Sequence, residues 1–237
     1  MVNNFTIYGE RCSGTSYLEG IITKNFNAKI TWDFGWKHFF GFDDLSTPKA
    51  QDTLFIAIVR DPVDWLNSLY KNPYHLPEHL TPKPLVGNLQ TRINIHNNNA
   101  FHFLNDTFWS IHHDSTAENI KDRNIFTKQR YKNIFEMRHT KLKFLIETMP
   151  TKVNHYILVR HEDLLNNFEE TMLRIKTAGD FQTNDGIDFP QNTNKYKGHK
   201  NIIFDKNAPK KPLFIPKHKI LNHPNFVQKY EKQLKYI

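Results

Sequence analysis

The sequence predicts an α/β fold, a mainly parallel sheet flanked by helices, and three observations support this prediction. Residues 5–8, FTIY, are a short apolar run that suits a buried strand, and a glycine-bounded loop and a helix-like pattern follow it. Residues 54–59, LFIAIV, form a continuous apolar run of the kind that central strands of parallel sheets carry. A chain of 237 residues can bury a sizeable core. We expect a single domain over residues 1–237, with a variable segment around residues 72–130.

The loop after the first predicted strand has the features of an anion site. Gly9 opens the loop, and Gly14, Thr15 and Ser16 close it where the next helix begins. The N–H groups of a first helical turn point toward a ligand, and the helix dipole favours negative charge there. Thr15 and Ser16 add hydroxyl donors, and Arg11 adds a fixed positive charge. The loop therefore predicts a site for a phosphate-like group.

The spacing of the two glycines leaves two interpretations open. Gly9 and Gly14 stand as in the nucleotide-binding motif GxxxxGK[ST], but Thr15 occupies the position of the motif's lysine. The missing lysine argues against an ordinary NTPase. The alternative to an anion site is a strand–turn–helix unit that carries glycine for steric reasons, and the loop alone does not decide between the two.

A second junction between a strand and a helix follows residues 54–59. Asp61 is a good N-cap residue, and Pro62 is favoured as the first residue of a helix. Arg60 stands at the junction, where its guanidinium can make a bidentate contact with a second phosphate. Two such units close together in the sequence indicate a ligand with phosphate groups at two ends.

Together the two units resemble the cofactor site of the sulfotransferases that use 3′-phosphoadenosine-5′-phosphosulfate (PAPS). The family's first loop, often written with SGT, matches residues 13–16, SGTS. Its second element, an arginine after a central strand with a serine eight residues later, matches Arg60 and Ser68. Residues 159–165, VRHEDLL, are similar to the family's RYEDL segment. The resemblance spans most of the chain and implies the P-loop-like sulfotransferase fold.

The resemblance also implies roles for individual residues. It places the 5′-phosphosulfate of PAPS in the first loop and the 3′-phosphate at Arg60 and Ser68, with adenosine 3′,5′-bisphosphate as the product. In the family a basic, glycine-containing stretch near the C-terminus closes over the 3′-phosphate, and Lys197 and Gly198 are the matching residues here. The loop residues expected to hold the phosphosulfate are Arg11, Cys12, Ser13, Gly14, Thr15 and Ser16.

One departure from the family concerns the cation that faces the transferring group. Many members place Lys or Arg directly before SGT, where this chain has Cys12. We expect either Arg11, one residue earlier, or Lys37 to supply that charge. A cysteine at a helix N-terminus can be reactive, but no His or Asn in clear register with Cys12 supports a cysteine enzyme.

The aromatic stretch of residues 34–41, FGWKHFFG, holds the candidate catalytic groups. It follows a predicted short strand at residues 29–32, and in parallel α/β sheets the carboxyl ends of strands face the ligand crevice. Lys37 would steady the transferring sulfuryl group, and His38 would act as the general base. The alternative, a solvated lysine and a structural histidine, stays open on the sequence alone.

Composition restricts the partners and the location. The formal net charge of +8 favours anionic partners. A single cysteine excludes an intrachain disulfide and favours a reducing compartment. The sequence shows neither a leader pattern nor an apolar run as long as a membrane span, so we expect a cytoplasmic protein. Because no HxH or HExxH pattern occurs, we expect no metal site.

The reaction that we expect is in-line transfer of a sulfuryl group from PAPS to a hydroxyl or amine. The acceptor would be a small molecule or a carbohydrate, with no nucleic acid as partner. One alternative is a P-loop nucleotide or nucleoside kinase, which would need Mg²⁺ and a Walker-type lysine that the sequence does not place. Another is a basic nucleic-acid-binding protein whose anion loops hold backbone phosphates.

The rest of the chain gives coarser expectations. Residues 72–90 contain four prolines and predict a loop. Apolar residues at helical spacing predict helices over residues 101–111 and 131–149, and residues 155–159 predict a strand. The end of the chain, residues 226–237, predicts a short amphipathic helix.

Overall fold

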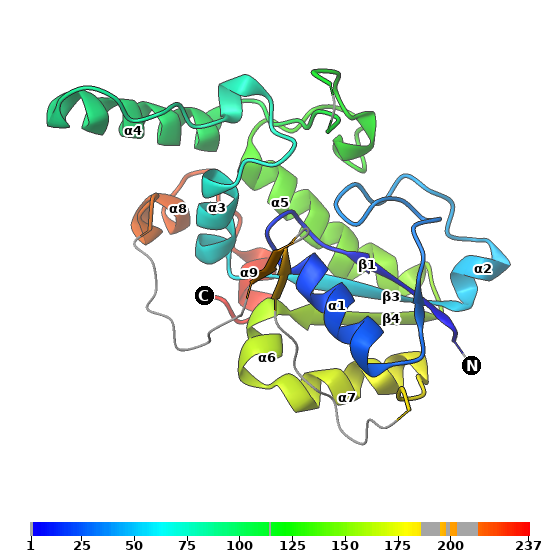
Figure 1. Ribbon diagram of the computed structural model, residues 1–237. Helices are drawn as coiled ribbons and strands as arrows, with labels where there is room; N and C mark the ends of the chain where they lie inside the picture. The colour runs from blue at the N-terminus through cyan, green and yellow to red at the C-terminus, as the bar shows by residue number, and fades with distance from the viewer. Residues whose placement is uncertain (1, 114, 186–194, 198–199, 203–212) are drawn as a thin grey trace. The chain divides into compact units, whose positions relative to one another are not determined.

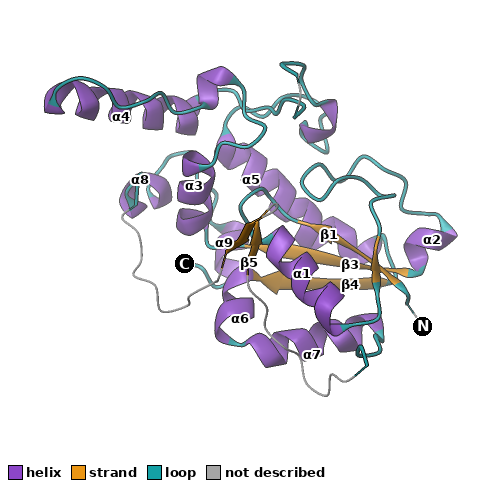
Figure 2. Cartoon of the chain, viewed as in Figure 1, coloured by secondary structure: helices purple, strands orange, loops and turns teal. Residues whose placement is uncertain are grey.

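The computed structural model describes residues 2–113, 115–185, 195–197, 200–202 and 213–237, and Figures 1 and 2 show their helices and strands. The chain groups into two compact units. The first unit comprises Met1–Asp61 and Leu145–Lys211, and the second comprises Pro62–Phe144 and Pro212–Ile237. A single domain over residues 1–237 stays a prediction.

The first unit is built on a four-stranded sheet. In spatial order its strands are β2 (Lys29–Ile30), β1 (Asn4–Tyr8), β3 (Thr53–Val59) and β4 (His155–Arg160). Every neighbouring pair is parallel, with Asn4 opposite both Lys29 and Thr53, and Leu54 opposite His155. The predicted α/β class, a parallel sheet flanked by helices, is therefore confirmed.

One face of this sheet carries the main core of the first unit. Helices α1 (Thr15–Asn25) and α7 (Phe168–Gly179) supply its other half, and α6 (His161–Asn166) follows β4 directly. Side chains alternate between the two faces of a strand, so every second strand residue points into this core. The central members of the cluster, all at 0 % exposure, are Phe5, Ile7, Leu18, Ile21, Ile22, Leu54, Ile56, Ile58, Val159, Leu164, Met172 and Ile175.

Near the end of β1, the aromatic stretch of residues 34–41 covers the opposite face of the sheet. The ring of Tyr8 stacks on Phe40 at 4.9 Å between ring centroids, and Phe34 lies 5.2 Å from Phe55. The Tyr8 hydroxyl donates a 2.5 Å hydrogen bond to the Phe34 carbonyl oxygen. Burial raises the pKa of Tyr8, so its hydroxyl stays a neutral donor. These contacts fix the stretch that leads to Lys37 and His38.

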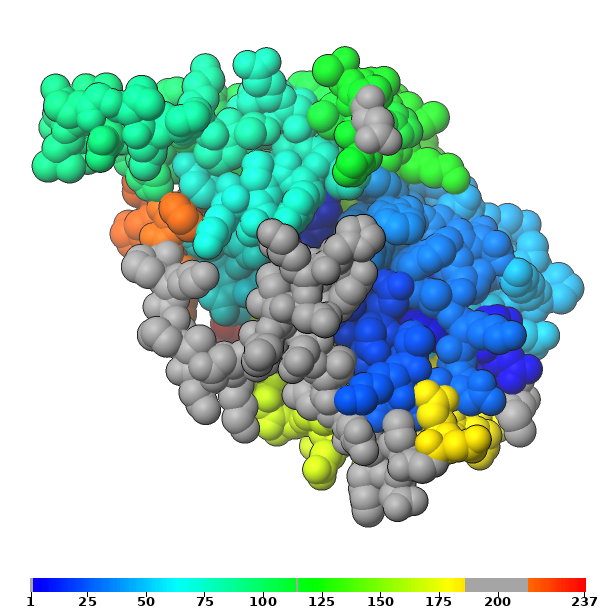
Figure 3. Space-filling model, in the orientation of Figure 1, coloured from blue at the N-terminus to red at the C-terminus, as the bar shows by residue number. Residues whose placement is uncertain are grey.

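Shorter elements complete the first unit. Helix α2 (Pro48–Gln51) is capped by Thr47, η4 (Met149–Thr151) precedes β4, and β5 (Lys195–Lys197) pairs antiparallel with β6 (Lys200–Ile202). The backbone of β5 lies beside α1. Residues 181–185 adjoin the C-terminal end of α1, where the N–H of Asn184 donates to the Asn25 carbonyl at 2.9 Å (Figure 3, the yellow surface beside the blue one).

The second unit is helical. Its elements are α3 (Pro62–Lys71), η1 (Glu78–Leu80), α4 (Leu89–Asn105), η2 (Ile120–Asp122), α5 (Ile134–Lys143), α8 (Lys217–Leu221) and α9 (Lys229–Gln233). After α5, Phe144 opens the π-helical turn η3 (Phe144–Thr148), whose other residues belong to the first unit. The Arg138 guanidinium on α5 forms a buried bidentate pair with Glu231 on α9, with one contact of 2.8 Å. This pair fastens the C-terminal segment to α5.

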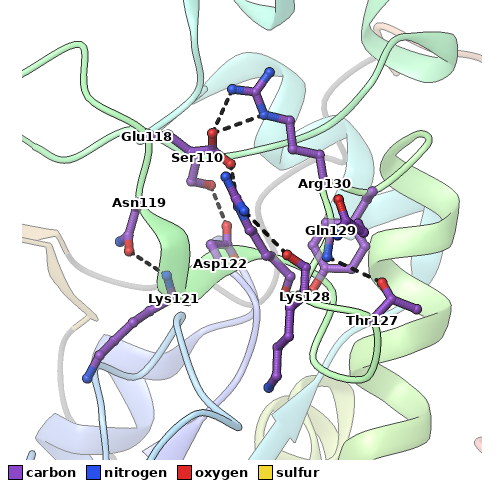
Figure 4. A network of polar contacts seen from close by, with 11 residues as sticks. Ser110, Glu118, Asn119, Lys121, Asp122, Thr127, Lys128, Gln129 and Arg130 are labelled. Atoms are coloured by element: carbon purple, nitrogen blue, oxygen red, sulfur yellow. Dashed lines mark hydrogen bonds and ion pairs between the residues drawn. The ribbon is translucent and has the colours of Figure 1, made fainter.

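A polar network holds the segment before α5 in the second unit. Glu118 accepts hydrogen bonds from Arg130 and Arg123, at 2.6 and 2.9 Å (Figure 4 shows the Glu118–Arg130 pair). The Asp122 carboxylate, at 0 % exposure, accepts from the Ser110 hydroxyl and pairs with the Lys141 ammonium. The carboxylates of this segment are thus satisfied from within the unit.

Three helix predictions were wrong in their bounds. The helix expected over residues 101–111 is α4, which ends at Asn105; beyond it, Phe108 and Ile111 form isolated β-bridges with Tyr131 and Glu118. The helix expected over residues 131–149 begins later, at Ile134, because Asn133 caps its start, and after Lys143 it continues as the π-helical turn to Thr148. The C-terminal helix is limited to α9. Among the described helices, none is both long and apolar enough to cross a bilayer.

Candidate functional site

The carboxyl ends of β1, β3 and β4 meet at one edge of the sheet of the first unit. The chain leaves β1 through α1 and returns as β2 on one side, whereas β3 lies on the other side of β1. A reversal of this kind is the topological switch point of an open α/β sheet, where ligands bind outside the carboxyl ends of the strands. Gly9, Arg60 and His161 directly follow the three strands at this edge.

The loop between Gly9 and Gly14 is shaped by close packing. A Cβ atom on Gly9 would lie 2.6 Å from the Ile58 carbonyl oxygen, and one on Gly14 would lie 2.4 Å from the Cδ2 atom of His161. Gly14 also has a φ of 95°, in the left-handed region that favours glycine. Both glycines are required by the shape of the loop, so their presence alone does not separate an anion site from a steric turn.

The start of α1 supplies the donors that the sequence predicts. Gly14 is the N-cap residue and has no side chain to cap the first turn, in contrast to Thr47, Asn88 and Asn133 before α2, α4 and α5. The first turn contains no acidic residue. The N-cap residue therefore provides no side-chain acceptor for the N–H groups of this turn. The helix dipole favours an anionic ligand at the same position.

Lys37 reaches this first turn from the aromatic stretch. Its Nζ atom lies 3.0 Å from the Ser16 hydroxyl and 3.3 Å from a carboxylate oxygen of Glu19. The ammonium also lies 5.7 Å from the ring centroid of Trp32 and 5.3 Å from that of Trp36. The structure therefore brings Lys37 and Ser16 together, as the sequence suggested for two groups at one crevice edge.

His38 is tied to the first glycine of the loop. Its Nδ1 atom lies 2.7 Å from the Gly9 carbonyl oxygen, and the Gly9 N–H donates to the Lys37 carbonyl at 2.9 Å. A carbonyl oxygen only accepts, so in the neutral ring the proton sits on Nδ1 and the lone pair on Nε2. The loop thus sets the tautomer that a general base at Nε2 requires.

Arg11 is buried in the loop, and Cys12 next to it is half-buried. Arg11 is 1 % exposed, with a terminal nitrogen 3.9 Å from a carboxylate oxygen of Glu10 and its guanidinium 5.7 Å from the centroid of the Phe39 ring. Cys12 is half-buried and has a φ of 65°. The charge of Arg11 is therefore held inside the protein, and a direct contact between Arg11 and a ligand stays a prediction.

Arg60 joins the second junction to the first loop. One of its terminal nitrogens donates to the Cys12 carbonyl at 2.9 Å, and the N–H of the next residue, Asp61, donates to Glu162 on α6 at 2.9 Å. The Arg160 side chain donates to Asp163 at 3.0 Å. These bonds give the acidic residues Glu162 and Asp163 a structural role at this junction.

The remaining predicted residues are distributed differently. Ser13 and Thr15 are buried in the first unit beside Gly14. Ser68 lies on α3 in the second unit, and its part in the site stays a prediction. The backbone of Lys197 belongs to β5, and Gly198 lies outside the described residues.

Three residues near the loop were not recognised in the sequence: Glu10, Glu19 and His161. Glu10 is 7 % exposed, and His161 packs against the N-cap glycine of α1. For Glu19 a signal existed, because it stands three residues after Ser16 and so shares its face of a helix. Over the described part of the chain, no group of three or more His, Cys, Asp or Glu side chains is placed to hold a metal ion.

Comparisons with known proteins add a distant likeness. No protein-family model matches the sequence, and a search of curated protein sequences finds no match. Among solved structures, the chain is similar to the crystal structure of mouse sulfotransferase SULT7A1 complexed with PAP, with a TM-score of 0.39 and 10 % sequence identity over 99 % of this chain and 82 % of that chain. A similarity with so low a TM-score and identity does not show the activity of this chain.

Proposed function

We propose that the protein is a PAPS-dependent sulfotransferase that moves a sulfuryl group to a hydroxyl or amine of a small-molecule or carbohydrate acceptor. The observation that carries the proposal is the attachment of residues 37 and 38 to the anion loop. Lys37 contacts Ser16 in the first turn of α1, and His38 donates to the carbonyl of Gly9. At the switch point of the sheet, a cation therefore lies at the helix start and a candidate base lies at the first glycine of the loop.

The residues of this edge fit a ligand with anionic groups at two ends. The first turn of α1, the Ser16 hydroxyl and the Lys37 ammonium would hold the phosphosulfate end, since N–H groups and cations stabilise its charge. Arg60, fastened to the loop through the Cys12 carbonyl, would hold the 3′-phosphate end. The sequence resemblance alone supports a contact of the 3′-phosphate with Ser68, Lys197 and Gly198. When bound, PAPS supplies the activated sulfuryl group.

Each catalytic residue then has a defined task. His38 would accept the proton of the acceptor hydroxyl at Nε2, because its Nδ1–H is occupied by the Gly9 carbonyl. Lys37 would place positive charge where negative charge develops during transfer. Arg11, buried in the loop, would add positive charge beside the phosphosulfate.

The surroundings of His38 indicate where the acceptor would bind. Trp36, two residues before His38, is 45 % exposed and offers an aromatic ring at the surface of this stretch. The net charge of +8 suits an acceptor that is itself anionic. The single cysteine suits a reducing compartment, and we place the reaction in the cytoplasm.

Product analysis tests the proposal. The protein is incubated with PAPS and a panel of phenols, sugars and amines, and sulfated products are followed by mass spectrometry. We expect one acceptor class to gain a sulfuryl group, with release of one adenosine 3′,5′-bisphosphate for each product. Transfer of a phosphoryl group from ATP–Mg²⁺ to the same panel, with no product from PAPS, would support the kinase alternative instead.

A further inference from the structure

We infer that Glu19 is a positioning residue for Lys37, and that the same carboxylate weakens the binding of anions at the start of α1. The inference rests on the proposed function, because it concerns a neighbour of Lys37 in the same site. Glu19 belongs to none of the motifs that the sequence offers. It lies on α1, at the start of the second turn of the helix.

The geometry joins Lys37 to two residues on one face of α1. The Nζ atom lies 3.0 Å from the Ser16 hydroxyl and 3.3 Å from a Glu19 carboxylate oxygen. Ser16 and Glu19 are three residues apart, which places them side by side on a helix. The Lys37 side chain is 10 % exposed and that of Glu19 is 32 % exposed, so the ion pair is partly shielded from water. The ammonium is therefore held over the first turns of the helix.

Glu19 makes the strongest of the contacts that fix the ammonium. The rings of Trp32 and Trp36 approach it at 5.7 and 5.3 Å, which are cation–π contacts of modest strength. The Ser16 hydroxyl is a neutral partner, whereas a carboxylate makes a charge-assisted bond. A lysine side chain has many rotamers, so losing the carboxylate would let the ammonium leave the position from which it can act in the transition state.

The same carboxylate opposes the ligand. An anion at the start of α1 lies within about one helical turn of Glu19, and like charges at that separation repel through partly screened solvent. Glu19 therefore has two effects of opposite sign. By positioning Lys37 it raises turnover, and by repulsion it lowers the affinity for an anion. If Glu19 only stabilised the loop, its removal would lower both the turnover and the affinity for the anion.

The variant Glu19→Gln separates the two effects, because it removes the charge and keeps the shape. We expect its dissociation constant for adenosine 3′,5′-bisphosphate, measured by calorimetry at low salt, to fall about threefold to tenfold, and its kcat to fall about tenfold. The gain in affinity should disappear at about 1 M salt, where screening is strong. The variant Glu19→Asp, which restores the charge, should return the affinity to that of the wild type. Both parameters within twofold of the wild type, or a joint loss of affinity and turnover, would overturn the inference.

A double-mutant cycle with Lys37→Ala assigns the effect on turnover. Once Lys37 is absent, Glu19→Gln should leave kcat unchanged and still tighten the binding of the bisphosphate. A further tenfold loss of kcat in that background would mean that Glu19 acts without Lys37. Glu170→Gln, at an exposed position on α7, is the charge-matched control and should change neither parameter. If the wild type binds no bisphosphate, the proposed function fails; if it binds and Glu19→Gln behaves like the wild type, only this inference fails.

Discussion

The Nδ1 atom of His38 lies 2.7 Å from the carbonyl oxygen of Gly9, so the candidate base is joined to the first residue of the anion loop. Because the carbonyl must accept, this bond leaves the lone pair of the neutral imidazole on Nε2. The contact also fixes the ring relative to the start of α1. The position and the tautomer of His38 therefore both suit a residue that accepts the proton of the acceptor.

Two substitutions at His38 separate its position from its chemistry. An asparagine at this site can still donate a hydrogen bond from its amide to the Gly9 carbonyl, but it has no basic nitrogen. We expect both His38→Asn and His38→Ala to lower turnover by about 10²–10⁴, with the affinity for adenosine 3′,5′-bisphosphate near that of the wild type. The measurements are kcat with a working acceptor and calorimetry with the bisphosphate.

The control for His38 is the exposed His112 of the second unit. His112→Ala should leave both parameters unchanged. Full activity in His38→Asn would place the base elsewhere, and activity that falls only in step with affinity would make His38 a structural residue of the loop.

Arg60 offers a test of the second phosphate. We expect Arg60→Ala to weaken the binding of adenosine 3′,5′-bisphosphate by about 2–4 kcal/mol, as for the loss of a buried charge-assisted contact. AMP lacks the 3′-phosphate and should be affected little. Arg60 also donates to the Cys12 carbonyl at 2.9 Å. Equal losses for the two ligands would therefore show that this backbone contact is its main role.

Two glycines of the α1 region provide a matched pair of variants. Gly14→Ala places a methyl group 2.4 Å from the Cδ2 atom of His161 and keeps a φ of 95°, so we expect a loss of stability of about 1–3 kcal/mol and a loss of bisphosphate binding. Gly20→Ala meets nothing within 4 Å and should stabilise α1 by about 0.5–1 kcal/mol. Chemical denaturation and calorimetry check both. Unchanged bisphosphate affinity in Gly14→Ala would contradict the role of the loop.

The sheet of the first unit was predictable because its signals are local. Each apolar run ends at a residue that forces a turn or starts a helix, such as Gly9 after β1 and Pro62 shortly after β3. By contrast, the bounds of α4 depend on Asn88, whose side chain caps the helix, and on an Asn-rich stretch that carries little apolar periodicity.

The contacts inside the candidate site were not predictable from spacing. His38 meets Gly9 across 29 positions, and Lys37 meets Glu19 across 18. Neither pair has a local pattern, because both depend on the aromatic packing of Tyr8, Phe34 and Phe40 that folds the stretch back over the sheet. The burial of Arg11 has a similar origin, since Phe39 reaches its guanidinium only in the folded unit. The sequence motif therefore identified the loop, whereas the contacts of Lys37 and His38 with the loop depend on the packing of the folded chain.

The acid stability of the second unit depends on Glu118. The guanidinium groups of Arg130 and Arg123 lower the pKa of Glu118 from its usual value of 4.5 to about 2. A lowered pKa stabilises the folded state fully above the unfolded pKa, and this contribution is lost as the pH falls through the folded pKa. We expect Glu118→Gln to lower the midpoint of urea unfolding at pH 7, and the difference from the wild type to shrink between pH 4.5 and about 2. A gap that stays constant down to pH 2 would contradict this assignment.

We propose that the edge of the sheet beyond β1 and β3 binds a nucleotide with phosphates at both ends. Calorimetry with the wild-type protein tests it most directly, with adenosine 3′,5′-bisphosphate, AMP and ATP–Mg²⁺ as three separate titrants. We predict saturable, one-to-one binding of the bisphosphate, weaker binding of AMP because one phosphate contact is missing, and no tight binding of ATP–Mg²⁺ because Thr15 replaces the phosphate-binding lysine. Tight binding of ATP–Mg²⁺ without binding of the bisphosphate would contradict the claim.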